Sequence, residues 1–279
     1  MDERELRAEI TAFVAGDAGN MMPGFQGERI FDEPVIGFAD ARDGIFQDYK
    51  RIIGGFHSTP LEWLGKTYPG ERFDSGSVIC WALPITEATR ISNREEMGYP
   101  SRRWALTKLY GERFNQLLRH RVVKLLTRDG FKAVASAASD RFETLFDDNV
   151  GRASNWSERH AAYAAGLGTF SLSDGFITEK GIAVRIGSAI TDMKLKPNGR
   201  RFKDHRENCL FFQAEKCVAC AGRCPAGAIT EKGHDKVKCR EYVNGAASEY
   251  ALERYGLKTA ACGLCQCGVP CESKIPSIV

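Results

Sequence analysis

The sequence predicts an α/β protein in which a front region of mixed helices and strands precedes a small cysteine-rich module. An apolar run of strand length, residues 77–85, is followed by an amphipathic helix over 101–128. Nine of the ten cysteines fall between Cys209 and Cys271. The 279 residues suffice for a large domain and a small one. We therefore expect a domain over residues 1–205 and a second over 206–279, joined through a polar stretch.

The first part of the front region predicts one helix, a long irregular segment and one strand. Apolar side chains share a face of the opening helix, which Gly16 suits as an end: Leu6, Ile10, Phe13 and Val14. Residues 17–76 lack a clear period, so we expect loops and short helices there. The run SVICWALPI over 77–85 predicts a buried strand that Pro84 ends, with Cys80 as a buried apolar residue.

The second part of the front region alternates helices and strands. The helix over 101–128 closes at Asp129-Gly130, and residues 133–138 are expected to form a strand. A further helix is expected from Trp156, ending near residues 166–168. Residues 176–191 alternate around a Glu-Lys-Gly turn, which predicts a β-hairpin.

The cysteine module begins with Cys217, Cys220 and Cys224, the last followed by Pro225. Two-cluster bacterial ferredoxins use C-x2-C-x2-C-x3-C-P, in which the last cysteine serves the other cluster. Ala214 stands where the first cysteine of that pattern is expected, so Cys209 is the available substitute. The spacing predicts 4Fe-4S clusters.

Nine cysteines are available and two clusters need eight. We assign one cluster to the set Cys209, Cys217, Cys220 and Cys271, and the other to the set Cys224, Cys239, Cys262 and Cys265. Cys267 is left over. Two zinc sites are the alternative, since paired C-x2-C also suits tetrahedral zinc. The C-x3-C-P ending and the lack of a histidine-ligand pattern favour clusters.

Composition excludes several classes. No run of about 18 apolar residues is present, so we expect no membrane span. The first twenty residues lack the basic start and apolar stretch of a secretion signal, which predicts a cytoplasmic protein. A net charge of +3 gives no argument for nucleic-acid binding by charge alone.

Three segments together resemble one superfamily: WSERHAAYAAGLGTF over 156–170, GSAIT over 187–191, and the cysteine module. They are similar to the cobalamin-dependent epoxyqueuosine reductases and reductive dehalogenases. The resemblance implies a nitroreductase-like front domain that holds a base-off corrinoid. It also implies a ferredoxin-like domain whose two clusters relay electrons to cobalt from a donor such as ferredoxin or flavodoxin.

The resemblance also suggests residues of the site. Tyr163 is a candidate proton donor and His160 a candidate relay to it. Candidate cofactor contacts lie around the glycine turn, at the end of the 187–191 segment and after Cys239: Gly166, Leu167, Gly168, Thr169, Phe170, Thr191 and Tyr242. Packed or solvent-facing roles are the alternative for each. Glu158 and Arg159 are interpreted as a helix cap and an ion-pair partner.

One position departs from the pattern. Epoxyqueuosine reductases carry a catalytic aspartate six residues before the glutamate that matches Glu158, and this chain has Arg152 there. Epoxyqueuosine as the substrate is therefore in doubt.

The sequence thus predicts an iron–sulfur oxidoreductase that acts through a corrinoid on a small-molecule or tRNA-borne substrate. The alternative is a ferredoxin-like electron-transfer protein whose front domain binds a partner and no corrinoid. A third hypothesis is a protein that reduces the cobalt of another corrinoid protein.

Overall fold

The computed structural model describes residues 1–147, 150–214 and 217–277, and it has a mixed α/β fold with small antiparallel sheets. The largest sheet has four strands in the order β1-β2-β8-β3, and each neighbouring pair is antiparallel. Its strands are β1 (Val35–Asp40), β2 (Ser77–Pro84), β8 (Val184–Thr191) and β3 (Ala133–Val134).

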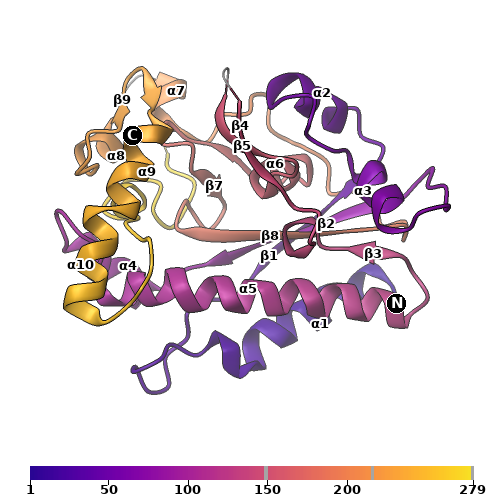
Figure 1. Ribbon diagram of the computed structural model, residues 1–279, viewed down its shortest axis with the longest axis horizontal. Coiled ribbons are helices and arrows are strands. Elements are labelled where there is room, and N and C mark those ends of the chain that lie inside the picture. The colour runs from indigo at the N-terminus through magenta and orange to yellow at the C-terminus, as the bar shows by residue number, and fades with distance from the viewer. Residues whose placement is uncertain (148–149, 215–216, 278–279) are drawn as a thin grey trace.

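Helices cover both faces of this sheet (Figure 1). One face packs against α1 (Glu3–Gly16) and α5 (Arg102–Arg128). The other packs against α2 (Ile45–Ile52), α3 (Pro60–Thr67) and α6 (Glu158–Ala164). Every residue of β2 is buried, because alternate side chains enter the two apolar layers.

The helix α5 is the longest element, and polar side chains fix it to the sheet. Its N-cap is Ser101, whose Oγ accepts a hydrogen bond from the Trp104 amide at 3.2 Å. Near its middle, Asn115 accepts from Trp81 Nε1 at 2.8 Å and donates to the Ile186 carbonyl at 3.0 Å. These bonds join α5 to β2 and β8.

Two expectations for the strands were wrong. Residues 176–191 do not form a hairpin: β7 (Phe176–Thr178) pairs with β6 (Gly168–Phe170), whereas β8 pairs with β2 and β3. The long buried partner β2 outweighs the local turn, since β8 pairs with it along its whole length. The strand expected over 133–138 is only β3, and a 3-10 turn follows it.

The edge strand β1 lies in the segment that was expected to hold only loops and short helices. The other front helices and the buried Cys80 agree with expectation. Residues 144–154 form a small hairpin of β4 (Thr144–Asp147) and β5 (Gly151–Ser154).

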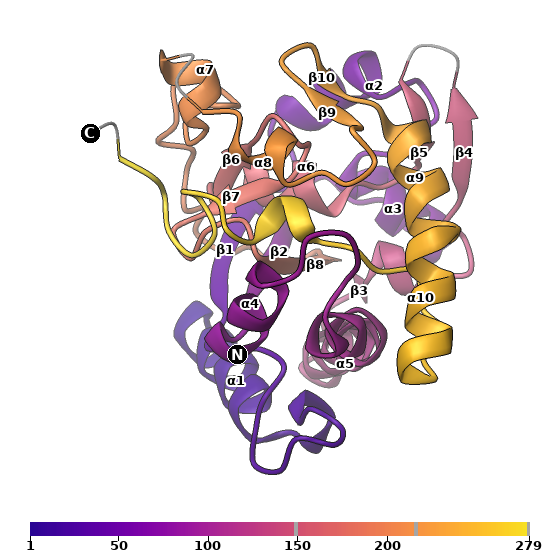
Figure 2. The same ribbon diagram turned by 90° about the vertical axis from the view of Figure 1, so that its left-hand side faces the viewer.

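The cysteine-rich segment lies at one end of the sheet (Figure 1). Its elements are α7 (Leu210–Ala214), α8 (Ala219–Gly222), β9 (Ile229–Thr230), β10 (Gly233–His234), α9 (Lys236–Asn244) and α10 (Ala246–Tyr255). The segment that holds the 3-10 turn Leu264–Gln266 runs between α8 and α4 (Glu87–Arg94), as Figure 2 shows. Among the described residues, no helix combines the length and apolar character needed to cross a bilayer.

Candidate functional site

Four cysteines lie together beside α8. Cys209, Cys217, Cys220 and Cys271 all line one small cavity that apolar side chains enclose. Burial, and then the charges of Cys209 and Cys217, raise the pKa of Cys220 to about 11. Burial and the same neighbours raise the pKa of Cys271 to about 12. We call these four residues the first cysteine group.

Four other cysteines lie together between α8, α9 and the C-terminal segment. Burial raises the pKa of Cys262 to about 11, and the nearby Cys239 and Cys224 contribute to the rise. The pKa of Cys265 is raised strongly by burial and by the other cysteines around it. The amide of Ala228 donates to Cys224 Sγ at 3.3 Å. Cys224, Cys239, Cys262 and Cys265 form the second cysteine group.

Cys267 lies outside both groups. It is fully buried, and Asn93 Nδ2 is 3.8 Å from its sulfur. Burial raises its pKa to about 12, and the charged groups that act on it are Glu272, Arg223 and Arg90. The groups that shift the pKa of Cys267 within the described residues include no other cysteine.

Buried thiols with raised pKa values resist ionisation, so a cation must compensate their charge if they are to act as thiolate ligands. Among the described residues, no three His, Cys, Asp or Glu side chains are placed to hold a single metal ion. A tetrahedral zinc ion needs its sulfurs about 2.3 Å from one point. The ligands of a cubane cluster stand further apart, because iron and sulfide ions lie between them.

A cavity of about 580 Å³ lies between the second cysteine group and the elements α5, α6 and β8. All four cysteines of the second group line this cavity. Cys220 of the first group contributes to the raised pKa of Cys265, so the first group lies near the cavity as well. The opposite wall comes from α5, α6 and β8 and carries Lys108, Glu158 and Arg185. This is the cysteine-lined cavity.

Glu158 is the acidic residue in that wall. It accepts hydrogen bonds from Arg119 Nε at 3.1 Å and Nη2 at 3.0 Å, and also from the Ser188 hydroxyl. Burial raises the pKa of Glu158 and outweighs the opposing charge of Arg119. A carboxyl with a raised pKa beside a cavity can hold and release a proton. The sequence indicated only a helix cap here, since its ion-pair partner Arg119 is 39 residues away.

Two other polar side chains of this wall have an atom without a hydrogen bond in the part of the chain that the structure describes. Thr107 Oγ1 and Arg185 Nε are buried and have no hydrogen-bond partner among the described residues. The charge of Arg185, followed by burial, lowers the pKa of Lys108. These groups can bind an anionic or carbonyl-bearing ligand.

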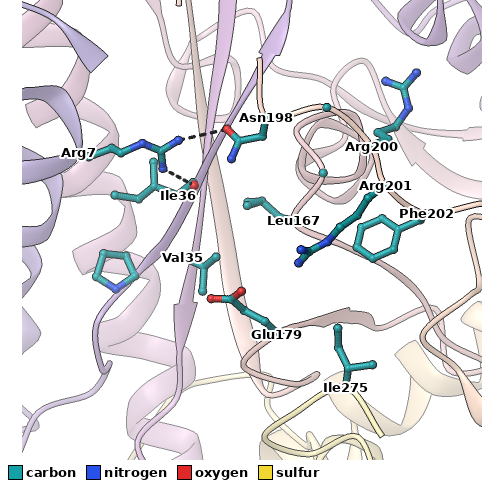
Figure 3. A pocket seen from close by; sticks show the side chains of 13 residues that line it. Arg7, Val35, Ile36, Leu167, Glu179, Asn198, Arg200, Arg201, Phe202 and Ile275 are labelled. Atoms are coloured by element: carbon teal, nitrogen blue, oxygen red, sulfur yellow. Dashed lines mark hydrogen bonds between the residues drawn. The ribbon is translucent and has the colours of Figure 1, made fainter. Parts of the chain in front are cut away.

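Most cofactor contacts inferred from the resemblance lie elsewhere. Gly166 and Leu167 line a separate cavity of about 530 Å³, shown in Figure 3 between Arg7, Arg201 and Glu179. A Cβ on Gly166, which has a φ of +72°, would approach the Gly199 carbonyl oxygen to 2.3 Å. This glycine therefore serves a close contact between two chain segments.

The other residues of that set pack against or hydrogen-bond to neighbouring segments of the chain. A Cβ on Gly168 would meet the Ile177 carbonyl oxygen at 2.2 Å, and Thr169 Oγ1 accepts from the Asn208 amide at 2.8 Å. Phe170 packs on Phe176, and Thr191 Oγ1 accepts from the Met193 amide. Only Tyr242 of that set lines the cysteine-lined cavity, and its hydroxyl donates to the Gly98 carbonyl.

The two residues expected to move protons do not line the cysteine-lined cavity. His160 Nδ1 is 2.8 Å from Ser157 Oγ, and its ring packs between Tyr49 and Phe170. Burial, followed by nearby positive charges, lowers the pKa of His160 to about 3. Tyr163 is half-buried against Phe170.

No family model and no curated protein matches the sequence. Among solved structures, the catabolic reductive dehalogenase NpRdhA superposes with a TM-score of 0.52 at 16% identity, covering 87% of this chain and 30% of that one. The chain has the fold of this reductive dehalogenase. The likeness expected from the sequence is thus shown for the fold alone.

Two epoxyqueuosine reductase structures also match. The selenomethionine-labelled protein gives a TM-score of 0.46 at 19% identity, covering 87% of this chain and 62% of that one. The one with an epoxyqueuosine-modified tRNA-Tyr stem loop gives 0.47 at 16% identity, covering 96% and 66%. The chain therefore spans about three-fifths of these reductases and about a third of the dehalogenase.

Proposed function

We propose that the protein is an iron–sulfur oxidoreductase that delivers electrons to the cysteine-lined cavity for a reductive reaction. One 4Fe-4S cluster is assigned to each cysteine group. The observation that carries the proposal is the second group, whose four cysteines all face a cavity shared with the front domain. We assign the front domain to residues 1–205 as nitroreductase-like and residues 206–279 as ferredoxin-like.

The donor set fits two clusters, since each group supplies four thiols. The clusters would supply one-electron transfer. The two cysteine groups lie next to each other at Cys220 and Cys265, since the charge of Cys220 contributes to the raised pKa of Cys265. Only the second group borders the cavity, so electrons from a low-potential ferredoxin or flavodoxin are expected to arrive at the first group. The apolar side chains around the first group shield it from water.

A corrinoid is the proposed cofactor of the cavity, on the family resemblance. The fit rests on Tyr242 and on the unpartnered Thr107 Oγ1 and Arg185 Nε. When bound, it would supply low-valent cobalt for reductive removal of oxygen or halogen from a small-molecule or tRNA-borne substrate. The contacts expected at Gly166 to Phe170 and at Thr191 do not border this cavity, and their role as cofactor contacts stays a prediction.

The chain itself supplies the proton. Glu158 carries it on the carboxylate held by Arg119 and Ser188, and burial favours the protonated form. Lys108 and Arg185 orient an anionic group on the substrate from the same wall. Glu158 thus takes the role that Arg152 cannot fill.

The alternative function is an electron-transfer protein without a corrinoid, which the replacement of an acidic residue by Arg152 also fits. Anaerobic purification and reconstitution with iron, sulfide and cobalamin separate the two. Both require about eight iron atoms per chain and broad absorption near ~400 nm. Stoichiometric cobalamin binding that Thr107→Val weakens supports the reductase. Clusters without cobalamin binding support the electron carrier, and an iron-free folded chain refutes both.

A further inference from the structure

A second cavity, of about 490 Å³, adjoins the cysteine-lined cavity at Arg159, which lines both. The hairpin β4–β5, the helix α6, the loop at 205–206 and the start of α9 enclose it. Four separate segments bring positively charged side chains to it: Arg152, Arg159, Arg206 and Lys236, with His205 beside them. We call it the basic cavity.

Within the part of the chain that the structure describes, one carboxylate pairs with a member of this set: Asp204 Oδ2 is 3.4 Å from His205 Nδ1. Among the described residues, no ion pair is formed by Arg152, Arg206 or Lys236. The acidic residue that lines the cavity is Asp174, and its Oδ2 is 3.1 Å from His234 Nδ1. Holding like charges together without counter-charge costs free energy unless an anion is bound.

Arg159 is the central group of this arrangement. Its Nη1 donates to the Asp174 carbonyl, and no other hydrogen bond of its side chain is found among the described residues. Its side chain is exposed to the space of the two cavities, although protein surrounds it and this burial lowers its pKa. Arg159, Lys236 and His205 all line the basic cavity, and their charges contribute to the lowered pKa of the buried His160.

Apolar side chains also line the basic cavity: Ile52, which is 58% exposed, together with Ile53, Val150 and the half-buried Phe170. A cavity lined by both cations and apolar side chains matches a ligand that joins a phosphate to a flat apolar body. Arginine side chains are suited to phosphate because they present several donors in one plane.

We propose that the basic cavity binds a phosphate ester with a flat organic body, such as a nucleoside phosphate. The phosphate lies against Arg159, Arg206 and Lys236, and the body lies on Ile52 and Phe170. The free ester and the backbone of an RNA share this chemistry. Anion binding here needs no electrons, so it can be tested independently of the proposed redox function, although Arg159 lines both cavities.

Isothermal titration of the anaerobic cluster-loaded protein with adenosine 5′-monophosphate and with adenosine tests the proposal. We expect the monophosphate to bind at least about tenfold more tightly than adenosine, and more weakly as salt rises. The double variant Arg206→Gln/Lys236→Gln should lose about tenfold in affinity. The matched control Arg254→Gln, an exposed residue of α10 that lines neither cavity, should change it less than twofold.

A short RNA stem loop in the same titration distinguishes the two sources. Binding of the RNA that the double variant weakens, with weak binding of the monophosphate, assigns the site to a nucleic-acid backbone. The reverse assigns it to a free phosphate ester. Equal affinity for adenosine and its monophosphate, or equal losses in the double variant and in Arg254→Gln, would overturn the proposal. Iron content, measured on every variant, shows separately whether the clusters are intact.

Discussion

Serine substitution at Cys265 and at Cys267 should give opposite results, although the two residues are close in sequence. Cys265 belongs to the second cysteine group, and its pKa responds to Cys262, Cys239 and Cys224. Cys267 is buried against Asn93 and is perturbed by no other cysteine. Cys265→Ser therefore removes a proposed cluster ligand, whereas Cys267→Ser changes only packing.

The expected magnitudes follow from this placement. Iron should fall from about eight to about four atoms per chain in Cys265→Ser, and stay at about eight in Cys267→Ser. The second variant buries a hydroxyl in place of a thiol, but Asn93 Nδ2 can donate to it. We expect a cost of about 1 kcal/mol, or a thermal midpoint lower by about 2–4 °C.

The assay is iron and sulfide content of anaerobically reconstituted protein, with the electron paramagnetic resonance signal of the reduced state. Reduced wild-type protein should show two interacting clusters, and Cys265→Ser only the one assigned to the first group. Loss of half the iron in Cys267→Ser, with full iron in Cys265→Ser, would show that the assignment of ligands is wrong.

Three further predictions concern the front domain, and each is measured as a thermal midpoint at fixed scan rate. Glu158→Gln removes one of the two carboxylates that pair with the buried Arg119 and leaves Glu112, so it should cost about 1 kcal/mol, and the double variant with Arg119→Met should recover part of this; full additivity would contradict the pairing. Burial lowers the pKa of His57 to about 4, so its contribution to stability is present above pH 6.5 and is lost as the pH falls towards 4. The wild type should therefore lose about 1 kcal/mol more than His57→Phe between pH 7 and pH 5.5, and parallel losses would refute this. Gly166→Ala must fit a Cβ at 2.3 Å from a carbonyl oxygen at a φ of +72°, so it should lower the midpoint by about 4 °C or more, whereas the control Gly16→Ala, with open space at its Cβ, should not.

The sequence predicted those parts of the molecule that depend on local pattern. The strand at 77–84 and the helix at 102–128 follow from continuous apolar character and helical spacing. The sets of cysteines that meet in space could be proposed because the run from Cys217 to Cys224 has ferredoxin spacing and ferredoxins exchange ligands between their two halves, which places the distant Cys271 with the first set. Their role as cluster ligands stays a prediction.

The sequence could not predict features that depend on distant partners. Strand β8 leaves its neighbour β7 because β2 offers a longer buried partner. Strand β1 is short and lies at the sheet edge, so its pattern is weak. The position of Glu158 in the cavity wall depends on Arg119, which is far along the chain. Gly166 looked like a cofactor turn, yet the chain itself occupies the space that a Cβ would need.

The position of the Arg152 side chain indicates what this residue can contact. Arg152 lines the basic cavity and donates to Thr144 Oγ1, so it does not face the cysteines. Glu158 faces them instead, six residues later on α6. The arginine at position 152 thus adds a cation to the basic cavity, and the acid that faces the cysteines is the glutamate at position 158. The proposed anion site adjoins the proposed proton source, because Arg159, next to Glu158, lines both cavities.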